Sequence, residues 1–177
     1  MGILFLCTGN AARSVMAEAF LRRLAPGWTV ASAGTLAIGG LPVSVRTARA
    51  LHGLGFDARG HRSRQADKGH LDCADMVAVF EPSHLRWVRT NHPEAAARTA
   101  SLPRLARDLP TRASASAGAA LRQRLEPLRL GDVAPEEWEE VADPAGGDGA
   151  VFESCAARVL SLVGDLAARL GDPPAQA

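Results

Sequence analysis

The sequence predicts an α/β fold, in which short buried strands alternate with helices around a parallel sheet. Two apolar runs, residues 2–6 and 75–80, have the length and composition of strands that are buried on both faces. A helical pattern follows each run, which is the order that parallel strands require. The chain has 177 residues, of which 47% are hydrophobic and 22% charged. These values predict a single domain over 1–171 and a short tail over 172–177.

The first half of the chain alternates strand and helix. After the first strand, apolar residues recur at helical spacing over 14–24, and a Pro-Gly pair ends this helix. Residues 28–32 form the second predicted strand. The loop 36–42, which contains two glycines and a proline, separates it from a helix over 44–54.

The second half contains two further strands by prediction. A short helix over 65–71 precedes the strand at 75–80, and a helix over 83–90 follows that strand. Residues 98–102 are the fourth predicted strand. The last helix, 152–170, carries its apolar residues on one face and ends at a glycine.

Charge and hydropathy exclude several partner classes. The net charge is +1, so no large basic face for nucleic acid is expected, and the arginines of residues 59–64 are interpreted as a solvated face. No apolar run near the N-terminus is long enough for a signal peptide or a membrane span. We therefore expect neither a nucleic-acid partner nor a membrane partner; the sequence leaves the oligomeric state open.

The cysteine content favours a reducing compartment. The chain has three cysteines, an odd number that does not suit a disulfide framework, and we expect a cytoplasmic protein. No cysteine or histidine cluster has zinc spacing, so no metal and no cofactor are expected. Cys73 and Cys155 are predicted to be buried, inert residues.

Cys7 differs, because the segment CTGNAARS follows the first strand and leads into a helix. A turn of this length can point several backbone N–H groups inward at the helix N-terminus and form an anion site. Gly9 gives the loop freedom, and Asn10 tolerates a left-handed backbone. Arg13 adds a planar fork for two oxygens of a tetrahedral oxyanion. This positive field favours the thiolate of Cys7, to which Ser14 can donate a hydrogen bond.

A thiolate beneath a bound phosphate indicates phosphoryl transfer through a phosphocysteine. The loop amides and Arg13 would hold the charge on the equatorial oxygens. The leaving oxygen also needs a proton, most simply from an Asp or Glu on a nearby loop.

Six motifs occur in an order that resembles the low-molecular-weight protein tyrosine phosphatases and their bacterial relatives. The resemblance covers residues 2–105 and 141–170, and it implies a three-layer α/β/α fold with a four-stranded parallel sheet and a phosphate loop after the first strand. The motifs are CTGNAARS, the MAEA that follows it, SAGT at 32–35, HRSRQ at 61–65, CADMVAVF at 73–80 and ADP at 142–144.

The resemblance also implies roles for particular residues. The nucleophile of the family matches Cys7, its phosphate-binding arginine matches Arg13, and the general acid of its Asp-Pro loop matches Asp143. Asp143 could instead be a turn residue, with Asp148 or Asp132 as the acid. The phosphate-binding loop matches Thr8, Gly9, Asn10, Ala11, Ala12, Arg13 and Ser14, and the supporting hydrogen-bond network matches Ser32 and His61.

The substrate loops depart from the family pattern. Members usually carry an aromatic residue after Asp-Pro, where this chain has Ala145, and another in the loop 36–42, where it has none. A flat ring would lose stacking worth about 1 kcal/mol per aromatic partner, which favours a substrate other than phosphotyrosine. The segment 107–140 is longer than the corresponding segment of the family. We interpret it as a lid or a substrate-specific element, in which Trp138 replaces one of the missing aromatic residues beside the substrate.

The central part of this segment gives mixed signals. Residues 111–118 have loop composition, and 119–130 are compatible with a helix that Pro127 interrupts. Residues 136–140 place one tryptophan among four glutamates, and 142–149 have loop composition.

The resemblance implies a cysteine-dependent phosphomonoesterase that acts on a phosphorylated protein or a small phosphomonoester. One alternative is a thiol-linked arsenate reductase on the same fold, although Ala12 stands where a loop cysteine is often found. A degenerate phosphatase that only binds a phosphorylated partner is a second alternative. A phosphatase specialised for a metabolite or for a kinase of a polysaccharide pathway is the third.

Overall fold

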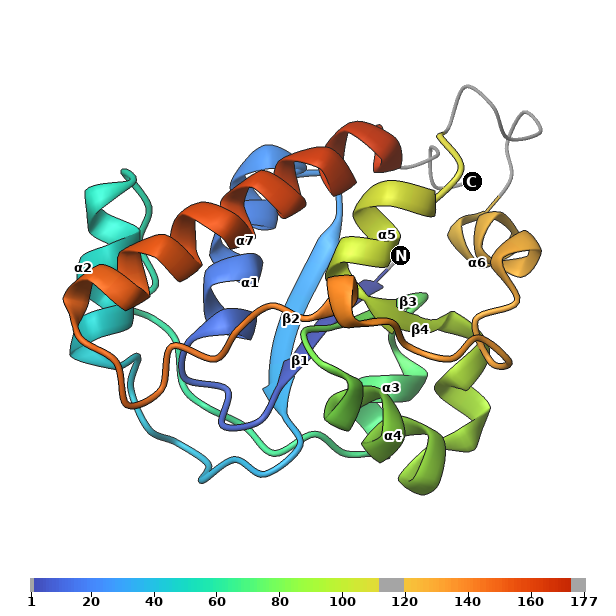
Figure 1. Cartoon of the computed structure of the whole chain (residues 1–177), viewed down its shortest axis with the longest axis horizontal. Coiled ribbons are helices and arrows are strands. Elements are labelled where there is room, and N and C mark those ends of the chain that lie inside the picture. The colour runs from blue at the N-terminus through green and yellow to red at the C-terminus, as the bar shows by residue number, and fades with distance from the viewer. Residues whose placement is uncertain (1, 112–119, 173–177) are drawn as a thin grey trace.

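A four-stranded, fully parallel sheet forms the centre of the computed structural model, which describes residues 2–111 and 120–172 (Figure 1). The strand order is β2-β1-β3-β4. In the register, Leu4 of β1 lies between Ala31 of β2 and Val77 of β3. The strands are β1 (Gly2–Cys7), β2 (Thr29–Gly34), β3 (Met76–Val79) and β4 (Thr99–Ser101).

Helices cover both faces of this sheet. On one face α7 packs against α1, α2 and α5, and Figure 1 shows these helices above and to the left of the strands. The other face is covered by α3 and α4. The α-helices are α1 (Arg13–Leu24), α2 (Val45–Gly53), α3 (Lys68–Asp72), α4 (Pro82–Asn91), α5 (Leu102–Asp108), α6 (Leu121–Leu125) and α7 (Gly149–Leu170). The 3₁₀ helices are η1 (Pro93–Arg98), η2 (Glu126–Leu128) and η3 (Glu137–Glu139).

The apolar residues of the strands divide between two cores. Along β1, Ile3 and Phe5 pack with α1 and α7, while Leu4 and Leu6 pack with α3 and α4. Alternate strand residues point to opposite faces, so a strand that is apolar throughout fits a sheet covered on both sides. The predicted three-layer α/β/α fold is confirmed.

The segment 102–140 contains the main differences from the sequence-based elements. The helix α5 was missed, because it follows directly on the three residues of β4. The expected helix over 119–130 is only α6 followed by η2, and Arg129 then takes a left-handed conformation at φ 48°. The predicted loop 111–118 lies almost entirely outside the described residues, as does the predicted tail.

One further expectation was wrong. Cys73 is exposed, because it follows the short helix α3 rather than lying within β3. Cys155 is buried on α7, as expected. Within the described residues, none of the helices has both the length and the apolar character needed to cross a membrane.

Candidate active site

Cys7 and Arg13 flank a tight loop between β1 and α1. Cys7 is the last residue of β1, and Arg13 is the first residue of α1. The Cys7 thiol is buried, and its Sγ lies 3.0 Å from the hydroxyl of Ser14. The loop therefore lies at the carboxyl end of the central strand and opens a helix, as the sequence predicts.

Asn10 fixes the shape of this loop. It is fully buried, and its backbone is left-handed at φ 51°. Its side-chain amide donates to the hydroxyls of Ser14 (3.0 Å) and Ser32 (2.8 Å), and its side-chain oxygen accepts from the backbone N–H of Arg64. Ser32 in turn donates to Glu18 at 2.5 Å, so the unusual backbone of Asn10 is held from several sides.

Two further residues hold the loop against β2. His61 donates from Nε2 to the backbone carbonyl of Asn10 at 2.9 Å, and burial lowers the pKa of its imidazole. Gly34, at the end of β2, faces the loop so closely that a Cβ atom would lie 2.4 Å from the Thr8 carbonyl oxygen. The predicted supporting positions of Ser32 and His61 thus both contact Asn10.

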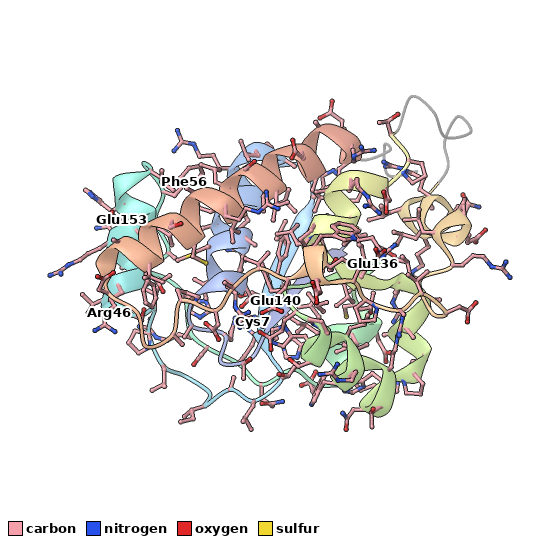
Figure 2. The ribbon with its side chains drawn as sticks, in the orientation of Figure 1. Cys7, Arg46, Phe56, Glu136, Glu140 and Glu153 are labelled. Carbon is pink, nitrogen blue, oxygen red and sulfur yellow. The ribbon has the colours of Figure 1, made fainter. Side chains whose placement is uncertain are left out.

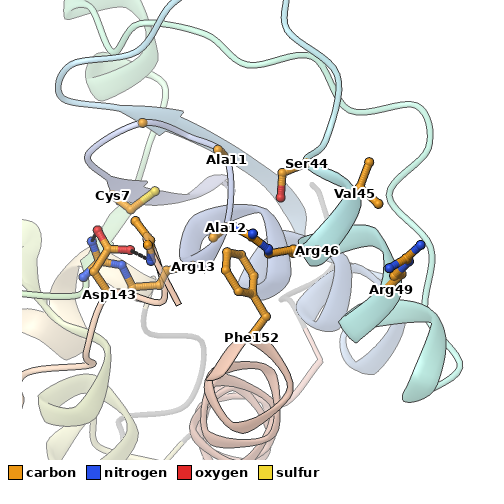
Figure 3. Close-up of a pocket in the computed structure, with 13 residues that line it drawn as sticks. Cys7, Ala11, Ala12, Arg13, Ser44, Val45, Arg46, Arg49, Asp143 and Phe152 are labelled. Carbon is orange, nitrogen blue, oxygen red and sulfur yellow. Dashed lines mark hydrogen bonds and ion pairs between the residues drawn. The ribbon is translucent and has the colours of Figure 1, made fainter. Parts of the chain in front are cut away.

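The guanidinium of Arg13 is almost completely buried, with 1% of the side chain exposed. Nη1 donates to Glu81 at 2.6 Å and to the carbonyl of Val141 at 3.0 Å, and Nη2 donates to Asp143 at 2.7 Å. Charge-assisted bonds on both sides fix the plane of the guanidinium. Arg13 is therefore pre-oriented beside the Cys7 thiol (Figure 3).

Asp143 reaches the site from a distant part of the chain. The backbone N–H of Val141 donates to the carbonyl of Phe80 at 2.8 Å, which anchors this segment at the end of β3. One Asp143 oxygen accepts from Arg13, and the other accepts from the N–H of Ala145 at 3.1 Å. The side chain is 42% exposed, so it contacts solvent and Arg13 at once.

Glu81 was not identified from the sequence, yet it shares the guanidinium of Arg13 with Asp143. Burial alone would raise the pKa of the Glu81 carboxyl, but hydrogen bonds from Ser83 and Arg13 outweigh it and place the pKa below its ordinary value. Glu81 is therefore an anion that orients Arg13 rather than an acid. It immediately precedes α4, in the segment that follows the strand beside β1.

His84 is the second residue that the sequence did not reveal. Its Nε2 lies 3.0 Å from the hydroxyl of Thr8, while its Nδ1 is buried without a partner in the described part of the chain. Burial lowers the pKa of the imidazole from 6.5 to about 4, against the opposing attraction of Glu81. His84 is neutral near pH 7 and supports the loop from the α4 side.

The titration of His84 predicts a loss of stability in mild acid. Between pH 6.5 and about 4 the unfolded chain binds a proton at this residue and the folded chain does not, so stability falls as the pH falls. By linkage the loss between pH 7 and pH 5 is about 2 kcal/mol. Urea unfolding at the two pH values should show a smaller loss in His84→Gln than in the native chain.

A matched control is His52→Gln, since His52 is exposed on α2. It should keep the pH dependence of the native chain. Equal pH dependence in native and His84→Gln proteins would show that His84 does not carry this effect.

Cys7, Arg13 and Asp143 line a cavity of about 580 Å³. Its lining includes Cys7 and Arg13 at one end and Arg46 with Arg49 at the other (Figure 3). Such a volume is far larger than a phosphate group and is typical of a small-molecule site. The remaining lining residues are Gly9, Ala11, Ala12, Ser44, Val45, Asp143, Ala145, Gly146 and Phe152.

The cavity does contain an aromatic wall, but not the expected one. Phe152, which the sequence places on the buried face of α7, lines the cavity. The hypothesis for Trp138 was wrong: its ring lies against the guanidinium of Arg107, 3.7 Å from the ring centre. No described residue of 107–140 lines the cavity, so the lid interpretation gains no support.

Two of the remaining candidates lie elsewhere. Asp148 caps α7 by accepting from the N–H of Val151, and Asp132 lies in the turn after η2. Burial raises the pKa of the Cys155 thiol to about 11, and the nearby positive charge of Arg13 lowers it by less. Of the three candidate acids, only Asp143 contacts Arg13.

Comparison with known proteins identifies relatives of this site. Residues 2–110 match the family described as "Low molecular weight phosphotyrosine protein phosphatase". The chain is 35% identical over 103 residues to a protein of Ralstonia nicotianae named "Probable low molecular weight protein-tyrosine-phosphatase EpsP", which covers 58% of this chain and 69% of that protein. It is 41% identical over 101 residues to a "Protein-arginine-phosphatase" of Geobacillus stearothermophilus, covering 56% and 68%.

A solved structure agrees over almost the whole chain. The "YwlE arginine phosphatase from Geobacillus stearothermophilus" superposes with a TM-score of 0.73 at 30% sequence identity, covering 94% of this chain and 90% of that one. The similarity therefore extends beyond residue 110, where the match to the family ends.

Proposed function

Because this chain belongs to the low molecular weight phosphotyrosine protein phosphatase family, we propose that Cys7, Arg13 and Asp143 carry out its phosphatase reaction. The chain is a cysteine-dependent hydrolase of this type. The observation that carries the residue assignment is that all three side chains line one cavity and that Asp143 bonds to Arg13 at 2.7 Å.

In the first step the Cys7 thiolate attacks phosphorus, and the phosphorus–oxygen bond to the leaving group breaks. The Ser14 hydroxyl, 3.0 Å from Sγ, donates to the thiolate and stabilises it. The phosphoryl group is transferred to sulfur, which gives a phosphocysteine.

Arg13 and the loop amides stabilise the charge that the equatorial oxygens carry during this transfer. Nη1 stays on Glu81 and Val141, while a phosphoryl oxygen competes with Asp143 for Nη2. A dianionic ligand on Nη2 releases Asp143 from the ion pair. The released carboxyl group is then free to donate a proton to the leaving oxygen.

Asp143 acts in both halves of the reaction. In its protonated form it donates a proton to the leaving oxygen, and in the second half its carboxylate accepts a proton from the attacking water. Water then cleaves the phosphorus–sulfur bond, releasing inorganic phosphate and the Cys7 thiolate. Pro144 restricts the backbone of Asp143 and helps to aim its side chain.

Asp143→Asn should be sensitive to the leaving group. For an alkyl phosphate, whose alkoxide cannot leave without a proton, we expect kcat/KM to fall by about 10²- to 10⁴-fold. For 4-nitrophenyl phosphate, whose phenolate leaves readily, the fall should be less than about tenfold, since little proton donation is needed. Steady-state kinetics with both substrates measures this difference.

The control is Asp148→Asn, which tests the alternative acid and keeps an asparagine able to cap α7. In this variant the ratio of kcat/KM for 4-nitrophenyl phosphate to kcat/KM for the alkyl phosphate should equal that of the native enzyme. Equal losses with both substrates in Asp143→Asn would contradict the assignment of the general acid.

The substrate is a phosphorylated protein or a small phosphomonoester. The relatives named above are a tyrosine phosphatase and an arginine phosphatase, so phosphotyrosine and phosphoarginine peptides belong in the same substrate panel. Phe152 adds an aromatic side chain to the cavity lining, which supports aryl phosphates more than the sequence alone did. Arsenate with a small thiol completes the panel, and thiol-dependent arsenate reduction without phosphate hydrolysis would favour the reductase alternative.

We also propose that the enzyme acts in the cytoplasm. Its mechanism needs Cys7 as a free thiol, and all three cysteines are unpaired. A reducing compartment keeps them so.

A further inference from the structure

We propose that Arg46, with Arg49 one turn further along α2, binds a second anionic group of the substrate. The preferred substrate is then a phosphate monoester that carries a carboxylate or a second phosphate at its other end. This inference rests on the proposed function, since it assumes that the phosphoryl group lies at Cys7.

The position of Arg46 is the first argument. It lines the same cavity as Cys7, and in Figure 3 its guanidinium extends from α2 toward Ala12 of the phosphate loop. The guanidinium carbon lies 5.9 Å from the centre of the Phe152 ring. At this distance the ring attracts the guanidinium, although the side chain stays exposed to solvent.

The absence of a partner is the second argument. Among the described residues, neither Arg46 nor Arg49 forms an ion pair or a side-chain hydrogen bond, although both are exposed. Arg13, by contrast, is already bonded to two carboxylates. The unpaired positive charge of the cavity therefore lies at its α2 end.

The rest of the lining is the third argument. Apolar side chains supply much of the remaining lining, and in Figure 3 Ala12 and Phe152 lie between Arg13 and Arg46. A ligand that spans the cavity meets polar groups at its ends and an apolar surface between them. A phosphate monoester with an apolar or aromatic middle and a distal anion matches this distribution of charge.

Figure 2 shows which residues lie on the two sides of Cys7 in the whole molecule. Arg46 lies on the α2 side of Cys7, and Glu136 lies on the opposite side. The second anion is thus directed toward α2 and away from the acidic segment 136–140.

A matched pair of small substrates tests the proposal. We would measure kcat/KM for 3-carboxyphenyl phosphate and 3-carbamoylphenyl phosphate, together with the corresponding 4-substituted pair. The native enzyme should prefer the carboxylate of at least one pair by about tenfold, as for a hydrogen-bonded ion pair that is partly exposed. In Arg46→Gln this preference should fall to about one, and raising the salt concentration should weaken it in the native enzyme.

Two variants make the comparison specific. Arg46→Lys keeps the charge but not the planar fork, so it should retain part of the preference. Arg86→Gln removes one exposed arginine of α4, outside the cavity, and should retain all of it. The two substrates of a pair also differ in how readily their phenolates leave. This difference affects the native enzyme and each variant equally, so it cancels when their carboxylate preferences are compared.

Phosphotyrosine peptides with glutamate or glutamine beside the phosphorylated residue form a second arm. A preference for glutamate that Arg46→Gln removes would identify an acidic protein segment as the source of the anion. A preference seen only with the small pair would identify a small substrate with two anionic groups instead.

The proposal is overturned if the native enzyme shows no carboxylate preference in any pair, or if Arg46→Gln keeps the preference. Binding of 3-carboxybenzylphosphonate and 3-carbamoylbenzylphosphonate, measured by calorimetry, gives the same comparison without turnover. If neither aryl phosphate is hydrolysed but the phosphonates still differ in affinity, the proposed function fails while the anion subsite stands.

Discussion

Cys7→Ser is expected to abolish phosphatase turnover, with a fall in kcat/KM on the order of 10⁴-fold or more. A serine hydroxyl fits the same space and can still bond to Ser14, but it is a far weaker nucleophile than a thiolate near neutral pH. His84 does not assist the serine, because its Nε2 is bonded to the hydroxyl of Thr8. Steady-state kinetics with 4-nitrophenyl phosphate measures the loss.

Two comparisons separate lost chemistry from lost structure. Cys73→Ser changes an exposed cysteine and should keep native turnover. Cys7→Ser should still bind inorganic phosphate in a calorimetric titration, because Arg13 and the loop amides remain. Turnover that survives Cys7→Ser would mean that another group attacks phosphorus.

Arg13→Lys is expected to lower kcat/KM by about 10³-fold, the upper range for loss of one preorganised oxyanion donor. The native guanidinium bonds Glu81, Val141 and Asp143 from two nitrogens in one plane. A lysine carries all its donors on one nitrogen and cannot hold Glu81 and a phosphoryl oxygen in this geometry. The loss should appear with alkyl and aryl substrates alike, unlike that of Asp143→Asn.

Glu81→Gln tests whether Arg13 needs the negative charge of Glu81 or only a hydrogen-bond acceptor at that position. It keeps an acceptor for Arg13 but removes one of the two carboxylates that bond to it, so we expect a smaller fall than in Arg13→Lys. Thermal unfolding of each variant shows whether the fold is retained. If Arg13→Lys retains more than a tenth of native kcat/KM, the guanidinium is not needed to hold Glu81 and a phosphoryl oxygen at the same time.

The sequence predicted the sheet well because its strands are buried on both faces. Apolar runs such as 2–6 and 75–80 can be recognised without tertiary information. The helix α5 could not be recognised in this way, because its seven residues are too few for a clear helical period and depend on packing against α7. Its only local signals were Ser101, which caps it, and a proline in its first turn.

The loop from Cys7 to Ser14 was predictable because all its parts are consecutive in the sequence. Glu81 and His84 belong to a segment that resembles an ordinary helix start, and they reach the loop because β3 lies beside β1. The available signal was their position just after β3, because the residues that follow neighbouring parallel strands lie at the same edge of the sheet. Phe152 was placed correctly on the apolar face of α7, but helical periodicity cannot show that this end of the helix borders a cavity.

Trapping the phosphoenzyme tests the central claim most directly. Native and Asp143→Asn proteins would be mixed with 4-nitrophenyl phosphate, quenched rapidly, digested and mapped by mass spectrometry. We predict a phosphoryl group on the peptide that contains Cys7, with more of it in Asp143→Asn because water attack is slower without the carboxylate base. Release of 4-nitrophenol without any phosphoryl group on Cys7, or with the group on another residue, would contradict the phosphocysteine mechanism.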